Sequence, residues 1–232
     1  MSDPLARLEA RIGHTFRNRT LLTCAVTHPS FAQEHPGDES NQRLEFLGDA
    51  VLQILFAEDL YNHFPTEREG FLSRKRALLV NGTMLAVLAR EIGLDACLRL
   101  GASEEMSAGR TRTSSLGDAF EALVGAVYLD SDLPTVHRVV FGIFGDIDAR
   151  LACTEDADNP KGRLQELVQP LHGNNALRYE TIRIDGADHA REYEVAVHLL
   201  DRAVGSGRGS SKKLAEEAAA RVALAILRAE MT

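Results

Sequence analysis

Several features that would point to a membrane or secreted protein are missing from the sequence. No stretch of eighteen consecutive apolar residues is present, so a membrane-spanning helix is not expected. The first residues, MSDPLARLEARIG, lack the basic segment and apolar core of a secretory signal. Cys24, Cys97 and Cys153 are an odd set without CxxC spacing, which predicts reduced thiols in a cytoplasmic protein rather than disulfides or zinc ligands.

An excess of positive charge is also missing. The chain carries 26 Lys and Arg against 34 Asp and Glu, a formal net charge of −8 at pH 7. Proteins that bind nucleic acid usually present a basic surface, so an interaction with nucleic acid must depend here on where individual charges lie. A site with several metal-binding carboxylates would produce a net negative charge, although solvated acidic surfaces are a commoner cause.

Helical periodicity dominates the first part of the chain. In residues 41–63 the apolar residues follow the i, i+3, i+4, i+7 spacing of one helix face. The same reasoning predicts further helices over residues 70–92, with a possible break at Asn81-Gly82, and over residues 114–130 and 133–151. Few segments show the alternation of apolar and polar residues that is typical of a strand, so this part is predicted to be all-α.

The pattern changes after residue 152. Residues 153–159 are acidic and poor in apolar residues, as in a linker, and Asn159 and Pro160 then suit the N-cap and first position of a helix. Beyond this helix we predict two alternating strands, a third strand around three glycines and a closing alanine-rich helix, over residues 177–184, 192–199, 205–209 and 211–230. The sequence therefore predicts an all-α domain, residues 1–152, and a small α+β domain of order α-β-β-β-α, residues 160–232.

Two of the predicted helices each carry a pair of carboxylates on one side. Glu45 and Asp49 are four residues apart, and Asp118 and Glu121 are three apart, so each pair leaves its helix on the same side, away from the apolar face. Helical bundles build carboxylate metal sites from such pairs on facing helices. Oxygen ligands of this kind suit Mg²⁺ or Mn²⁺ better than Zn²⁺.

Acidic residues on a polar helix face are more often simply solvated, and this alternative applies to either pair alone. Three details favour a site. Lys and Arg are absent from the i+4 positions that surface pairing would use, and like charges at this spacing repel unless a cation neutralises them. Glycines flank the carboxylates where a solvent face would prefer good helix formers, and we expect Gly125 to leave the surface beside Asp118 and Glu121 open.

The segment NQRLEFLGDAVL, residues 41–52, strongly resembles the signature of the bacterial ribonuclease III family. The resemblance extends through IGHTF, LLTCAVTHPS, EGFLSRKRALLV and LGDAFEALVGAVYLD to the C-terminal part, where NPKGRLQELVQ, GADHAREYEV and GRGSSKKLAEEAAA are similar to a double-stranded-RNA-binding domain. It implies an all-α endonuclease domain that dimerises, residues 1–152, a linker, residues 153–159, and a double-stranded-RNA-binding domain, residues 160–232.

The resemblance also assigns roles to individual residues of the first domain. It implies that Glu45, Asp49, Asp118 and Glu121 bind the metal, with Asp49 and Glu121 the positions usually described as catalytic. Glu69 matches an acidic position at the edge of the cleavage centre. Phe46 matches a phenylalanine that inserts into a socket on the partner subunit, although a core position would be the default for this residue type. Many family members have glutamate where this chain has Gln42, which puts a metal-ligand role for that position in doubt but not a role in positioning RNA.

In the second domain, the expected RNA-binding residues fall into three groups. Lys212 and Lys213 begin the last helix, where free backbone N–H groups already favour phosphate, and Arg208 adds positive charge nearby. Gln165 and Glu166 match positions that contact minor-groove ribose in the family, and His189 matches one that enters a neighbouring minor groove. The alternative is that these last three residues are ordinary exposed positions.

The implied activity is Mg²⁺-dependent hydrolysis of double-stranded RNA, with Mn²⁺ as a substitute, to 5′-phosphate and 3′-hydroxyl ends with short 3′ overhangs. Ribosomal RNA precursors are the expected substrates, with some mRNA and tRNA precursors. The expected partners are the RNA duplex and a second copy of the chain, without a membrane or a small-molecule cofactor. Two alternatives are a protein that binds duplex RNA without cutting it, which Gln42 favours, and a helical metal phosphohydrolase acting on nucleotides, which the second domain disfavours.

Overall fold

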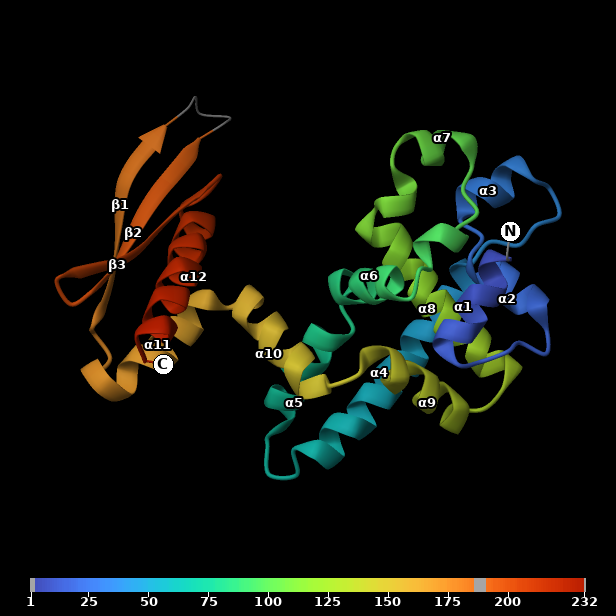
Figure 1. Ribbon diagram of the computed structural model, residues 1–232, viewed down its shortest axis with the longest axis horizontal. Helices are drawn as coiled ribbons and strands as arrows, with labels where there is room; N and C mark the ends of the chain where they lie inside the picture. The colour runs from blue at the N-terminus through green and yellow to red at the C-terminus, as the bar shows by residue number, and fades with distance from the viewer. Residues whose placement is uncertain (1–2, 186–190, 232) are drawn as a thin grey trace. The chain divides into compact units, whose positions relative to one another are not determined.

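The computed structural model describes the backbone of residues 3–185 and 191–231, and the side chains of these residues except 153–158 and 231. The chain divides into two compact units, residues 1–151 and 152–232 (Figure 1). Among the described residues, helices long and apolar enough to cross a membrane are absent. The described thiols of Cys24 and Cys97 are free.

The first unit is built from helices, as predicted. Their bounds in chain order are α1 Pro4–Ile12, α2 Arg19–Ala25, α3 Pro29–Glu34, α4 Gln42–His63, α5 Glu69–Leu79, α6 Gly82–Glu91, η1 Asp95–Cys97, α7 Ala102–Met106, η2 Gly109–Thr111, α8 Thr113–Asp130, α9 Leu133–Phe144 and α10 Ile147–Asp158. The last helix, α10, runs through the segment predicted as a linker, so residues 153–158 are helical.

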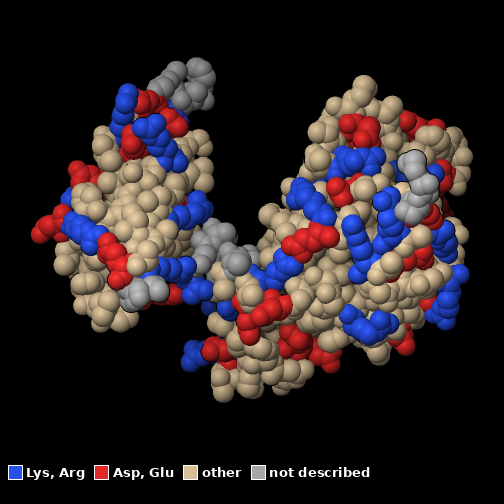
Figure 2. Space-filling view, in the orientation of Figure 1, with Lys and Arg blue, Asp and Glu red and all other residues tan. Residues whose placement is uncertain are grey.

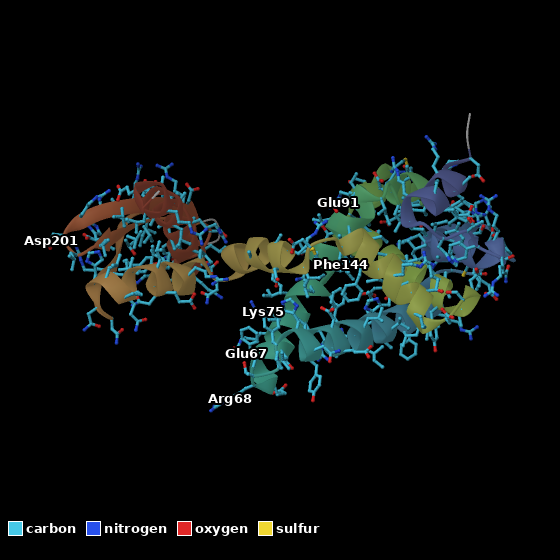
Figure 3. The ribbon with its side chains drawn as sticks, turned by 60° about the horizontal axis from the view of Figure 1, so that its bottom comes forward. Glu67, Arg68, Lys75, Glu91, Phe144 and Asp201 are labelled. Atoms are coloured by element: carbon cyan, nitrogen blue, oxygen red, sulfur yellow. The ribbon has the colours of Figure 1, made fainter. Side chains whose placement is uncertain are left out.

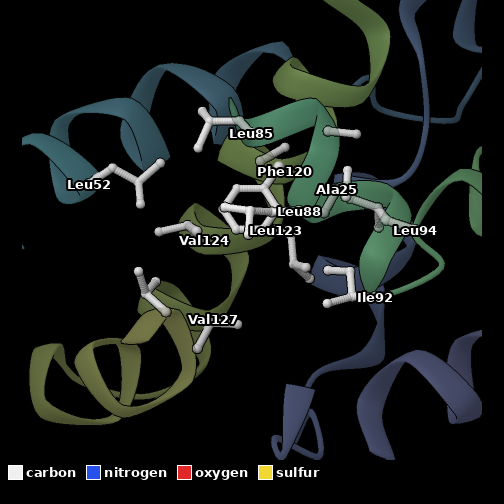
Figure 4. Close-up of a cluster of buried hydrophobic side chains, with 14 of the residues drawn as sticks. Ala25, Leu52, Leu85, Leu88, Ile92, Leu94, Phe120, Leu123, Val124 and Val127 are labelled. Carbon is white, nitrogen blue, oxygen red and sulfur yellow. The ribbon is translucent and has the colours of Figure 1, made fainter. Parts of the chain in front are cut away.

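Helix α8 is the centre of this unit. It packs along α4 and α6 and also contacts α2 and α9, so its side chains are buried on most sides (Figure 1). Phe120 and Leu123 of α8 meet Leu85 and Leu88 of α6 in the interior (Figure 4). Phe144, at the end of α9, points inward (Figure 3), and its ring centroid lies 4.6 Å from that of Phe56 on α4. This apolar interior fixes α4 and α8 against each other.

Two helix boundaries show how local chemistry sets the ends of the elements. The expected break at Asn81-Gly82 is confirmed, because the Asn81 side chain accepts a hydrogen bond of 2.9 Å from the Met84 N–H and caps α6. The single helix predicted over residues 133–151 is wrong. Gly145 has φ of +68° and ψ of −131°, a backbone conformation that favours glycine and ends α9, and α10 begins two residues later.

The second unit has the predicted α-β-β-β-α order. Its elements are α11 Pro160–His172, β1 Leu177–Asp185, β2 Glu192–Leu199, β3 Arg202–Gly209 and α12 Lys212–Met231. The strands form one antiparallel sheet in the order β1-β2-β3, and the Asn159 side chain caps α11 by accepting a hydrogen bond from the Gly162 N–H, as expected. Asp201 lies in the turn between β2 and β3 (Figure 3).

Glycines allow α12 to pack directly on the sheet. A side chain at Gly205 would lie 2.6 Å from the carbonyl oxygen of Ala219, and one at Gly209 would lie 2.7 Å from the Ala215 nitrogen. These glycines of β3 therefore face the helix, and the alanine-rich face of α12 completes a core of small and branched residues. Because side chains alternate along a strand, the intervening residues of β3 face the other side of the sheet.

Candidate active site

The site is formed where α4 crosses α8. A Cβ atom on Gly48 would overlap the carbonyl oxygen of Glu121, and one on Gly125 would overlap that of Leu44. Both glycines are buried, so the expectation that Gly125 leaves an open surface is wrong. The physical reason is helix packing, because without side chains at these two positions the two backbones can approach closely. This contact brings the acidic pairs of the two helices to one place.

The four predicted carboxylates share this place. Glu45, Asp118 and Glu121 are half-buried, whereas Asp49 is exposed. Burial, and then the negative charges of Asp49, Asp118 and Glu45, raise the pKa of Glu121 from 4.5 to about 7. Burial and the charges of Asp118 and Asp49 likewise raise the pKa of Glu45. Such mutual repulsion requires proximity, so the structure brings the two pairs together.

The surroundings of these carboxylates compensate little of their negative charge. Within the described part of the chain, no Lys or Arg forms an ion pair with any of the four, and the polar contact that Asp49 makes is with the Gln53 side-chain amide at 3.2 Å. The described side chains include no group of three or more His, Cys, Asp or Glu already arranged around a metal position. The donor set nevertheless fits a hard divalent cation, because clustered carboxylate oxygens lacking a positive partner are stabilised by one.

The raised pKa of Glu121 predicts a pH dependence of stability in chelator. Between pH 4.5 and about 7 the folded protein keeps a proton that the unfolded chain has lost, so the free energy of unfolding should fall as pH rises through this window. We expect Glu121 to contribute about 2 kcal/mol of this loss, after allowance for partial exposure to solvent.

Urea denaturation of the protein and of Glu121→Gln at pH 5 and pH 7.5 measures this contribution. The variant should lose distinctly less stability over this interval than the unmodified protein, because glutamine does not titrate. Equal losses would show that Glu121 titrates normally.

One residue near the site had no predicted role. His28 lies in the segment LLTCAVTHPS, which is part of the resemblance, but no chemical role is predicted for it from the sequence. In the structure burial raises the pKa of Asp118, and the charge of His28 opposes this effect by lowering it. Its position in the chain, outside both acidic helices, gave no signal of this electrostatic interaction.

The peripheral residues of the first unit are all at the surface. Gln42 is the first residue of α4, and its side-chain oxygen accepts a hydrogen bond of 3.4 Å from the Ser40 hydroxyl. Glu69 begins α5 and accepts a 2.7 Å hydrogen bond from the Ser73 hydroxyl. Phe46 has 81% of its surface exposed, so the default expectation that it belongs to the core of its own subunit does not hold.

The predicted RNA-binding residues of the second unit are distributed over more than one face. Lys212 and Lys213 begin α12, as expected. On α11, Gln165 donates a hydrogen bond to the carbonyl oxygen of Asn174, and the exposed Glu166 lies 3.3 Å from Arg163. Positive and negative side chains are mixed over the visible surface (Figure 2), which fits the absence of a basic excess.

Arg208 is separated from the lysine pair by the sheet. Its neighbours in β3, Gly207 and Gly209, face α12, so the Arg208 side chain lies on the opposite side, where it pairs with Glu194 at 3.2 Å. His189 lies outside the described residues.

Comparison with known proteins gives consistent matches to both units. A family model described as Ribonuclease-III-like matches residues 18–146, and one described as Double-stranded RNA binding motif matches residues 160–227. Ribonuclease 3 of Azotobacter vinelandii is 45% identical over 233 residues, covering 99% of this chain and 98% of that protein. Ribonuclease 3 of Pseudomonas paraeruginosa is 43% identical with the same coverage. A solved structure of the nuclease domain of ribonuclease III from Campylobacter jejuni is 34% identical with a TM-score of 0.57, covering 60% of this chain and 94% of that one.

Proposed function

Because this chain belongs to the ribonuclease III family, we propose that it is an endoribonuclease that hydrolyses double-stranded RNA. The observation that carries the proposal is the convergence of the carboxylates of α4 and α8. Three of the four are half-buried, and burial, followed by mutual repulsion, raises the pKa values of Glu45 and Glu121. An arrangement that destabilises the folded protein in the absence of a cation is typical of a functional site rather than a solvated surface.

We propose Mg²⁺, or Mn²⁺ in its place, as the cofactor, held by Glu45, Asp49, Asp118 and Glu121. When bound, the ion supplies charge stabilisation on the phosphoryl oxygens and lowers the pKa of attacking water. The chain's own contribution is to fix these oxygens on two rigid helices, with Asp49 and Glu121 as the catalytic pair. Gln42 and Glu69, exposed at the starts of α4 and α5, are proposed to position RNA at the periphery. The products are proposed to carry 5′-phosphate and 3′-hydroxyl ends.

The proposal is tested by incubating the full chain with a long perfect RNA duplex and a DNA duplex of the same sequence, with Mg²⁺ or with chelator. We expect short RNA duplexes with 3′ overhangs only in the Mg²⁺ reaction, and intact DNA in both. Binding of the RNA duplex without cutting at any Mg²⁺ concentration would favour the alternative, a non-cleaving RNA-binding protein, for which Gln42 is the supporting feature.

We propose that the chain acts as a homodimer through one face of α4. Phe46, Ile54 and Tyr61 lie along the same side of this helix and are 81%, 55% and 71% exposed. Large apolar side chains grouped on one face are typical of an interface. The related nuclease domain from Campylobacter jejuni is described as having a region involved in dimer formation. A dimer would place one cleavage centre on each strand of a duplex.

Replacing Phe46 by alanine should weaken dimerisation by about 100-fold, because a buried interface aromatic contributes roughly 2–4 kcal/mol. Sedimentation equilibrium gives the dissociation constant directly. Met106→Ala is the matched control, since Met106 is 84% exposed but lies on α7, away from this face. An unchanged constant for Phe46→Ala would contradict the proposed interface.

We propose that residues 160–232 bind the RNA duplex and are joined by residues 153–159 to a catalytic domain at 1–152. Lys212 and Lys213, at the start of α12, are the proposed phosphate contacts. Gln165, Glu166 and His189 are proposed to reach minor grooves, and Arg208 to contribute positive charge from the other side of the sheet. Precursors of ribosomal RNA, with some mRNA and tRNA precursors, are the proposed natural substrates.

Changing both Lys212 and Lys213 to glutamate should weaken binding to duplex RNA at least tenfold and reduce the slope of log affinity against log salt by about two. Arg178→Glu with Arg183→Glu is the matched control, because both arginines are exposed on the face of the sheet opposite α12. Filter binding at salt concentrations from roughly 50 to 200 mM measures the affinity and its salt dependence. Equal losses of affinity in the two double variants would argue against a contact specific to α12.

A further inference from the structure

Helices α11 and α12 of the second unit pack on each other through small and branched side chains. The buried core of this unit contains, from these two helices, Leu164, Val168, Ala219, Ala220 and Ala223. Side chains on one helix resist movement along another when they form ridges that fit into grooves, and alanine makes only a low ridge. A directional contact between the two helices would therefore add to what the core fixes.

Lys161 and Glu216 make such a contact one turn beyond the core. Lys161 lies three residues before Leu164 on α11, and Glu216 lies four residues before Ala220 on α12, so both continue the buried side of their helix. The Lys161 ammonium donates a hydrogen bond of 2.6 Å to the Glu216 carboxylate. The Lys161 Nζ also lies 4.5 Å from the ring centroid of Tyr179 on β1. Two helices and the sheet are thus joined at one point.

Each of these two charges is poorly placed without the other. Lys161 is in the first turn of α11, where the helix dipole disfavours a positive charge. The Glu216 side chain is only 16% exposed, and a carboxylate shielded from water to this extent is costly unless it is paired. The ammonium of Lys161 is therefore committed to Glu216 and differs from an ordinary solvated lysine.

The pair lies next to the residues proposed to bind RNA. Gln165 follows Lys161 by four residues on α11, and Lys212 precedes Glu216 by four residues on α12, so each is one turn from the pair on the same side of its helix. The minor groove and the phosphates of a duplex are held at a fixed separation by its A-form geometry. The spacing of α11 and α12 therefore decides whether both kinds of contact form at once.

Building on the function proposed above, we propose that Lys161 and Glu216 are positioning residues of the RNA-binding face. Their ion pair sets the spacing of Gln165 and Lys212, so that the minor-groove and phosphate contacts form together on one duplex. Neither member of the pair touches RNA in this role. Two competing explanations are that Lys161 itself binds a phosphate, and that the pair only stabilises the fold.

Replacing Glu216 by methionine distinguishes positioning from direct binding, because the two predict changes of opposite sign. The substitution removes a negative charge and frees Lys161, so a phosphate-binding Lys161 would make the affinity for RNA higher. A positioning pair predicts instead that the affinity falls by about 5–10-fold. Glu217→Met is the matched control, since the Glu217 side chain is 18% exposed and only loosely paired, with Lys213 at 3.9 Å. Its affinity should be unchanged or higher.

A double-mutant cycle in the full chain completes the test, with fluorescence anisotropy of labelled RNA and DNA duplexes of one sequence in chelator. Lys161→Met should also weaken RNA binding by about 5–10-fold, and the double variant should be no weaker than either single variant, because one shared interaction is lost. The loss should be larger for RNA than for DNA, since the 2′-hydroxyls read in the minor groove are present only in RNA. The slope of log affinity against log salt should not change, because the number of phosphate contacts is the same.

The proposal is overturned if Glu216→Met binds RNA as tightly as the unmodified protein or more tightly, or if the two single losses multiply in the double variant. A salt slope reduced by about one in Lys161→Met would make Lys161 a phosphate contact. A lower Tm with unchanged affinities, or equal losses for RNA and DNA, would leave the pair a purely structural role. Failure of the proposed nuclease function is distinguishable, because the unmodified protein would then leave duplex RNA intact at every Mg²⁺ concentration, whereas these affinities are measured without cleavage.

Discussion

Replacing Glu121 by glutamine is expected to slow single-turnover cleavage of duplex RNA by at least about 10³-fold at saturating Mg²⁺. The substitution keeps the shape of the side chain but removes the carboxylate whose pKa is raised to about 7 by burial and by its three acidic neighbours. Stabilisation of the developing phosphoryl charge by a correctly held ion contributes several kcal/mol to such a reaction, which corresponds to this factor. Rapid-quench measurements with a short labelled duplex give the rate.

The control for this prediction is Glu58→Gln, which removes an exposed carboxylate of α4 and should leave the rate within about twofold, as a surface substitution away from the site does. RNA affinity of the Glu121→Gln variant, measured in chelator, should also be unchanged, because Glu121 belongs to the first unit. Cleavage by Glu121→Gln at an undiminished rate would exclude this residue from the catalytic pair.

Replacing Gly48 by alanine is expected to destabilise the first unit by about 3 kcal/mol and to abolish cleavage. The added methyl group would overlap the carbonyl oxygen of Glu121, and a backbone atom within a helix cannot move aside as a flexible side chain can. The two helices must separate, so the acidic pairs separate with them. Urea denaturation, followed by a cleavage assay under conditions where the variant is folded, measures both effects.

Gly142→Ala is the matched control for this substitution. Gly142 also lies within a helix, α9, but a side chain there would meet open space. Alanine should therefore stabilise the protein by about 0.5–1 kcal/mol through its higher helix propensity. If Gly48→Ala were as stable and active as Gly142→Ala, the close crossing of α4 and α8 would not be required for the site.

The acidic pairs could be predicted from the sequence because their geometry is local. A helix places residues three or four apart on one side, so the grouping of Glu45 with Asp49, and of Asp118 with Glu121, follows from the sequence alone. The order of elements in the second unit was predictable for the same reason, since the change from helical to period-two spacing lies within short segments. Resemblance to a known family then supplied what local patterns lack, namely the pairing of the two helices.

Features that depend on contacts between distant segments could not be predicted in this way. Gly125 was taken as a sign of an open surface, whereas Gly48 and Gly125, more than seventy residues apart in the chain, together permit close contact between the backbones of α4 and α8. His28 was overlooked because its relation to Asp118 exists only in the folded chain. Arg208 was grouped with Lys212 and Lys213 by proximity in sequence, yet strand alternation turns its side chain to the other face of the sheet.

The most direct test of the account is whether one ion binds carboxylates from both helices. A double-mutant cycle in Mn²⁺ affinity, with Glu45→Gln on α4 and Asp118→Asn on α8, measures this in the full chain. Two residues that bind the same ion should be strongly coupled. The loss in the free energy of Mn²⁺ binding in the double variant should therefore differ from the sum of the losses in the two single variants by at least about 1 kcal/mol. Additive losses would contradict a shared site.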